Sequence, residues 1–135
     1  MKPGYIQNET PEKWGNMFES EEDFLSALDK HDRLIRQCAD GIVSFQDFLV
    51  KYEYFYGYYA LDGHESDESE LRMFEKYEER IKPHEELGTE IFLQLCDDND
   101  ALKDSYIKAG RFGSDEGLRR LRIVSKKYFC KEDQL

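Results

Sequence analysis

Helix-start signals recur along this 135-residue chain, and apolar residues follow each of them at helical spacing. Ser20 and Ser44 each precede an aspartate by three residues, which is a capping-box pattern. No segment alternates between apolar and polar residues over a length typical of a strand, and the chain has only three valines. The sequence therefore predicts an all-α fold.

The first two predicted helices follow these serines. One begins after Ser20 and ends at Gly41, because glycine readily adopts the left-handed backbone that closes a helix. The other begins after Ser44 and runs to about Leu61, where Asp62-Gly63 forms a turn.

Further helices are predicted towards the C-terminus. One begins near Asp67, and Pro83 either kinks it or occupies the first turn of a new helix. Residues 68–97 therefore form one kinked helix or two. A short helix is expected over residues 100–109, and Ser114 is expected to cap the last helix.

The N-terminus differs from the rest of the chain. Residues 1–19 contain two prolines and two glycines and show no periodicity. We interpret them as an extended arm, followed by a single domain over residues 20–135 that forms an irregular bundle of five or six helices. Apolar residues with which the arm could dock are Tyr5, Ile6, Trp14, Met17 and Phe18.

The chain is strongly acidic, with a formal net charge of −11. Residues 41–100 carry 5 basic and 16 acidic side chains. This charge favours a cationic partner and argues against a dedicated binder of nucleic acid or of an anionic membrane. The first residues lack the apolar segment of a signal peptide, and no stretch has transmembrane length, so we expect a cytoplasmic protein.

No motif for catalysis, a metal or a cofactor is complete in this sequence. The three cysteines, Cys38, Cys96 and Cys130, lack zinc spacing, and we expect reduced, half-buried thiols. We interpret His64 and His84 as surface histidines beside glutamates. Neither HExxH nor a phosphate-binding glycine loop is present. We therefore predict that the protein is not an enzyme and has no cofactor.

Aromatic residues are concentrated in the segment YEYFYGYY, which an acidic loop follows. On a continuous helix, most of them fall on one stripe with Phe45 and Phe48, which is typical of a core. Tyr54 and Tyr58 fall on a second stripe. Either the loop is merely solvated, or these tyrosines and the carboxylates after them bind a basic protein. The candidate residues are Tyr54, Tyr58, Asp62, Glu65, Asp67, Glu68 and Glu70.

The last predicted helix is basic. Its cationic side chains could contact phosphate, but no nucleic-acid-binding motif accompanies them. In a chain of net charge −11, pairing with the protein's own carboxylates is the interpretation that we prefer. The residues are Arg119, Arg120, Arg122, Lys126 and Lys127.

The stretch GYYALDGHESDESE resembles the recognition region of the nuclease-colicin immunity proteins, in which a tyrosine pair precedes acidic residues. Tyr58-Tyr59 occupies the place of that pair, and Asp62, Asp67 and Glu68 follow it. The resemblance implies a bacterial immunity protein that binds and blocks a basic, nuclease-type toxin domain, with Tyr59 as a further contact residue. The alternatives are a helical adaptor or structural subunit of a cytosolic complex, and a protein that contacts nucleic acid through its basic C-terminal helix.

Overall fold

The computed structural model describes residues 18–129, and this part of the chain is all-α, as predicted. The described residues contain no strand; Leu95 and Phe112 form only an isolated bridge. Between residues 18 and 129, no helix has the length and apolar character needed to cross a bilayer. The expected docking residues from Tyr5 to Met17 lie outside the described residues.

Both predicted serine caps are confirmed. Helix α1 spans Glu21–Ala39, and the Ser20 hydroxyl accepts a backbone N–H of its first turn at 3.1 Å. Helix α2 spans Phe45–Tyr52, and the Ser44 hydroxyl accepts the equivalent N–H, also at 3.1 Å. These bonds satisfy amide groups that have no acceptor inside the helix.

The second helix ends earlier than predicted. It does not run to Leu61: α2 ends at Tyr52, and α3 occupies only Phe55–Tyr58. Between them, Glu53 and Tyr54 both have left-handed backbone, with φ angles of 53° and 47°. Because each such residue costs about 1–2 kcal/mol, packing elsewhere must stabilise this break.

Tyr54 provides that packing. Its ring lies so close to Gly57 that a Cβ atom there would be 2.5 Å from a ring carbon. Its hydroxyl would lie 3.1 Å from a Cβ on Gly88, and the Phe92 ring centroid is 5.1 Å from its own. The left-handed pair thus directs Tyr54 onto two glycines that are 31 positions apart in the numbering.

Residues 68–97 contain two α-helices, and the break between them is at Tyr77. Helix α4 spans Glu68–Lys76. The Asp67 carboxylate caps it by accepting a first-turn N–H at 2.9 Å, which confirms the predicted start.

Pro83 lies inside a helix and does not form its boundary. Helix α5 spans Glu78–Leu87 and continues into a π-helical turn at Gly88–Phe92. This turn supplies the glycine and the phenylalanine that contact Tyr54.

The predicted short helix near residue 100 consists of two separate turns. A 3₁₀ turn spans Asp100–Leu102, and α6 spans Asp104–Lys108. Helix α7 spans Ser114–Phe129. Ser114 is its first residue, and the Asp98 carboxylate accepts both the N–H of Ser114, at 2.7 Å, and its hydroxyl, at 3.1 Å.

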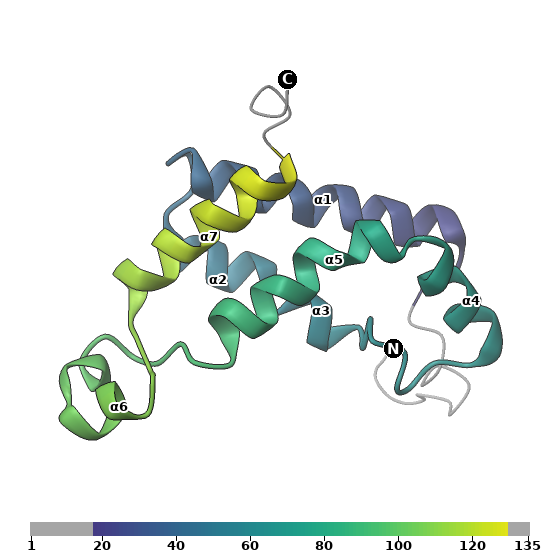
Figure 1. Cartoon of the computed structure of the whole chain (residues 1–135). Coiled ribbons are helices and arrows are strands. Elements are labelled where there is room, and N and C mark those ends of the chain that lie inside the picture. The colour runs from purple at the N-terminus through teal and green to yellow at the C-terminus, as the bar shows by residue number, and fades with distance from the viewer. Residues whose placement is uncertain (1–17, 130–135) are drawn as a thin grey trace, which may run out of the picture.

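Helices α1, α2, α5 and α7 pack around the core, while α6 projects at one end and α4 lies at the other (Figure 1). Phe18, the last residue of the expected docking set, packs against Phe24 and Phe74. The predicted core stripe of α2 is confirmed, although Val50 on the opposite side is 72% exposed. Fully buried side chains include Phe24, Leu28, Phe48, Tyr52, Phe55, Leu87 and Leu121.

Two of the three cysteines fall within the described residues, and both are free thiols. Cys38 is buried, and this burial raises the pKa of its thiol to about 11. Cys96 is half-buried. Both are thus unpaired as expected, but only Cys96 is half-buried, whereas Cys38 is more deeply buried than predicted; Cys130 lies outside the described range.

Candidate functional site

An open groove of about 660 Å³ lies between helices α4 and α5 and the segment that starts in α3. Its floor is apolar, because Leu61, Phe74 and Ile81 are buried there. Exposed carboxylates surround this floor. We call this feature the acidic groove, and it is lined by Tyr56, Leu61, Asp62, Glu68, Leu71, Arg72, Phe74, Glu75, Glu78, Ile81, Lys82 and Glu85.

Helices α4 and α5 contribute the same side-chain pattern to this groove. Each has an acidic, an apolar, a basic and a second acidic residue at positions i, i+3, i+4 and i+7. Positions three and four residues apart lie on one face of a helix, so each helix turns two carboxylates towards the groove. The residues are Glu68, Leu71, Arg72 and Glu75 in α4, and Glu78, Ile81, Lys82 and Glu85 in α5.

The groove has more carboxylates than its cations neutralise. Arg72 lies 3.6 Å from Glu68, and Lys82 lies 3.7 Å from Glu79 outside the groove. Three further carboxylates of α4 and α5 line the groove, those of Glu75, Glu78 and Glu85. None of them forms an ion pair with a described residue. This surface therefore attracts cations.

Tyr56 packs partly buried against the core, as expected for the predicted core stripe, and it also lines the acidic groove. Burial, with the negative charges of Glu85 and Asp62, raises the pKa of Tyr56 to about 12. Its hydroxyl thus keeps its proton at neutral pH and can donate a hydrogen bond in the groove. The i, i+3, i+4, i+7 pattern of charges was the sequence signal that could have located this site.

The predicted contact tyrosines do not line the acidic groove. Tyr54 is 37% exposed and packs on two glycines, whereas Tyr58 is 61% exposed. Because the helix breaks before α3, these two do not form the expected i, i+4 pair on a continuous helix. Tyr59 is half-buried and stacks on Phe18 at 4.8 Å between ring centroids. Tyr58 contacts Tyr59 edge-on, at 4.9 Å.

The acidic loop after α3 is organised by His64. The Asp62 carboxylate accepts the backbone N–H of His64 at 3.1 Å and lies 2.5 Å from its ring Nδ1. Glu65 lies 3.4 Å from the other ring nitrogen. The hydrogen bond with Asp62 is the main cause that raises the pKa of His64. Of the two acidic residues, only Asp62 lines the acidic groove.

The three acidic residues at the start of α4 have three different environments. Asp67 caps the helix, Glu68 is exposed in the groove, and Glu70 is only 3% exposed. The Glu70 carboxylate accepts the Phe18 N–H at 3.4 Å. Glu70 therefore packs inside the protein, and Asp67 has a structural role in addition to any role in binding.

The basic side chains of α7 interact largely with the protein itself. Arg119 and Arg120 each lie within 2.8 Å of the Glu116 carboxylate, whose pKa these two hydrogen bonds lower to about 2. Arg122 donates to the Ala39 carbonyl, and Lys127 pairs with Glu86. This agrees with the preferred interpretation of the C-terminal helix, although Lys126 has no such contact with a described residue.

A second cluster of polar residues is buried between α1, α2 and α5. The Tyr52 hydroxyl lies 2.6 Å from His84 Nδ1, and His84 Nε2 lies 2.7 Å from Asp32 Oδ1. Arg80 donates to Asp32 at 3.0 Å and to Asp29 at 2.9 Å. The prediction that His84 is a surface histidine was wrong, because it is fully buried.

This buried cluster satisfies its own hydrogen bonds. Burial, and then the Asp32 charge, keeps the pKa of Tyr52 well above its usual value. The hydroxyl thus keeps its proton and can donate to Nδ1, and the Nε2–H of His84 donates to the Asp32 carboxylate. His84 and Tyr52 are each 0% exposed, so this arrangement stabilises the packing of three helices and offers no access to a substrate.

The described residues include no group of three or more histidines, cysteines and carboxylates that could hold a metal ion. Comparison with models of protein families, with curated proteins and with solved structures gives no match to this chain. The acidic groove is therefore the feature from which we argue function.

Proposed function

We propose that this chain is a non-catalytic binding protein that holds a basic segment of a partner protein in the acidic groove. One observation carries the proposal: Glu75, Glu78 and Glu85 are exposed around an apolar floor and form no ion pair with a described residue. A lysine or arginine of the partner would supply the missing charge, and its aliphatic stem would cover the floor.

This combination of charge and apolar surface suits rapid and durable association. The carboxylates attract a cationic surface over a distance and raise the rate of association at low salt. The apolar floor, with Phe74 and Ile81, adds binding free energy once the partner covers it, and this slows dissociation. The Tyr56 hydroxyl adds a donor that fixes the orientation of the bound segment.

We extend the proposal to an inhibitor or immunity protein that blocks a nuclease-type toxin domain. A nuclease domain carries positive charge because it must hold phosphate. The resemblance of GYYALDGHESDESE to the nuclease-colicin immunity proteins supports this extension, and Asp62 and Glu68 belong both to that stretch and to the groove. Tyr58, which is largely exposed and belongs to the same stretch, would add an aromatic contact.

The first experiment captures the partner from a lysate of the source cell at low salt and identifies bound proteins by mass spectrometry. The groove variant is Glu75→Gln/Glu78→Gln/Glu85→Gln. The matched control, Glu22→Gln/Asp40→Asn/Asp104→Asn, removes the same charge from exposed residues that line no described groove. We expect one basic protein that the wild type and the control retain and the groove variant loses. Equal retention by all three proteins would contradict the role of the groove.

The second experiment separates the toxin inhibitor from an adaptor subunit. The captured partner is assayed for nuclease activity with and without one equivalent of this protein. We expect inhibition by the wild type and by the control, and little inhibition by the groove variant. A partner without toxic activity, held in a stable complex, would instead identify the adaptor function while leaving the groove as its binding site.

A further inference from the structure

A second groove, of about 340 Å³, lies between α1 and α2 and has the opposite charge. We call it the cationic groove. It shares no lining residue with the acidic groove. Three basic, two apolar, one amide and one acidic residue line it: Lys30, Arg33, Lys51, Leu34, Val50, Gln37 and Glu53.

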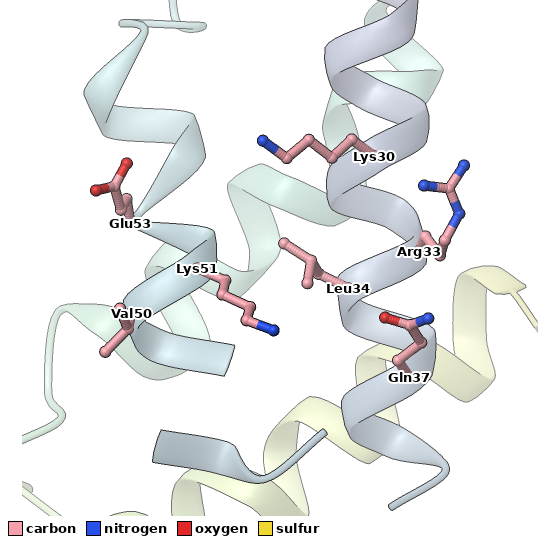
Figure 2. Close-up of a pocket in the computed structure, with 7 residues that line it drawn as sticks. All are labelled: Lys30, Arg33, Leu34, Gln37, Val50, Lys51 and Glu53. Atoms are coloured by element: carbon pink, nitrogen blue, oxygen red, sulfur yellow. The ribbon is translucent and has the colours of Figure 1, made fainter. Parts of the chain in front are cut away.

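The sequence places these side chains together for a simple reason. Lys30, Arg33, Leu34 and Gln37 occupy positions i, i+3, i+4 and i+7 of α1, and thus one face of that helix. Figure 2 shows Lys30 extending from α1, and Lys51 from α2, into the space between the two helices.

The charges of this groove are not neutralised by the protein. No ion pair or hydrogen bond joins the side chain of Lys30, Arg33 or Lys51 to another described residue. Other basic residues, such as Arg80, Arg119 and Lys127, pair with carboxylates. Lys108 and Lys126 have no ion pair with a described residue, but they line no described groove. These unpaired cations around one groove attract a multiply charged anion, and the two lysine ammonium groups that extend between the helices can donate to phosphate oxygens.

The apolar lining residues indicate that the ligand has an apolar group in addition to its anionic group. Val50 is 72% exposed beside Lys51, and Leu34 lies on the facing helix. Glu53, the one acidic lining residue, points away from α1 in Figure 2. We propose that the cationic groove binds a small organic phosphate, with its phosphate held by Lys30 and Lys51 and its apolar body against Leu34 and the exposed Val50 at the edge of the groove. The guanidinium of Arg33 is directed away from α2 in Figure 2, so Arg33 contributes positive charge at the opposite edge. The volume falls in the range of small-molecule sites.

The test follows amide NMR signals of the full chain during titration with inorganic phosphate, phenyl phosphate and benzoate at constant ionic strength. We expect saturable shifts in α1 and α2, with phenyl phosphate binding more tightly than inorganic phosphate and benzoate most weakly. Lys30→Gln/Lys51→Gln should weaken phenyl phosphate binding by about tenfold or more, because two charge-assisted contacts are lost. Val50→Ser should weaken phenyl phosphate but not inorganic phosphate.

The control variant Lys108→Gln/Lys126→Gln removes two exposed charges that have no described partner elsewhere in the fold. It should change affinity by less than about twofold, since distant exposed charges are screened by salt. Equal weakening by both double variants, or shifts that never saturate, would overturn the proposal. Binding of a glutamate-rich peptide in place of both phosphates would also overturn it and would assign the groove to a protein partner.

Discussion

Two regions of this molecule place carboxylates beside a tyrosine and a cation, but the carboxylates are paired in one region and largely unpaired in the other. In the buried cluster, Asp32 accepts from both His84 and Arg80, and Tyr52 completes the network. In the acidic groove, Glu75 and Glu85 lie exposed and have no ion pair with a described residue. Burial forces the first set to satisfy itself, because an unpaired buried charge is costly. The exposed carboxylates of the second set are solvated, so they can remain without an ion pair in the protein and bind a cationic partner.

The largest effect in this comparison is expected for Asp32→Ala. The substitution leaves His84 Nε2 without its acceptor and removes one of the two carboxylates of Arg80, so it should lower the free energy of unfolding by about 3–5 kcal/mol. Urea denaturation measures this. The groove variant Glu85→Gln should change the same quantity by less than about 0.5 kcal/mol. Similar losses for the two variants would remove the distinction between the regions.

A smaller effect is expected for Tyr52→Phe. The ring is retained, but His84 Nδ1 loses its donor inside the core, which should cost about 1–3 kcal/mol. Thermal or urea denaturation measures the loss, and Tyr58→Phe, at an exposed tyrosine, is the control. If both variants were as stable as the wild type, the Tyr52–His84 bond would not contribute to stability.

Neutralising the groove should leave the protein as stable as before or slightly more stable. The Glu75→Gln/Glu78→Gln/Glu85→Gln variant relieves repulsion between like charges, and we expect a gain of up to about 0.5 kcal/mol at low salt. The gain should shrink at about 1 M salt, where the screening length falls to about 3 Å. A clear loss of stability at both salt concentrations would show that these carboxylates have a structural role.

The smallest effect concerns the loop beside the groove. The hydrogen bond between His64 and Asp62 raises the pKa of His64 in the folded protein. This contact therefore stabilises the fold at pH values below the pKa of His64 in the unfolded chain. The stabilisation is lost as the pH rises through the pKa of His64 in the folded protein. NMR titration should show His64 above the ordinary histidine pKa and His31, whose pKa burial lowers, below it. Asp62→Asn should lower the pKa of His64. An unchanged pKa would rule out the Asp62 contact.

Local features of the fold could be predicted from the sequence. The caps at Ser20, Ser44 and Asp67 depend on a side chain and an amide three residues later, so short-range spacing is enough to find them. The end of α2 could not be found in this way. It depends on Tyr54 packing against Gly88, which lies on another helical segment.

The same distinction applies to the candidate site. His84 can be buried because Asp32 and Tyr52, 52 and 32 residues away, form hydrogen bonds with its two ring nitrogens. No local pattern contains that information. The acidic groove differs, because the charge pattern of α4 and α5 is visible in the sequence. The predicted contact residues followed the tyrosine pair, so they included Glu68 but not Glu75, Glu78 or Glu85.

The most direct test of the account measures the dissociation constant between this protein and the captured partner by calorimetry. The wild type, the Glu75→Gln/Glu78→Gln/Glu85→Gln variant and the matched Glu22→Gln/Asp40→Asn/Asp104→Asn control are compared. If the acidic groove holds a cationic segment, the groove variant should bind about tenfold more weakly or worse, since at least one charge-assisted contact is lost. The control should stay within about twofold of the wild type. Equal affinities of all three proteins would contradict the central claim.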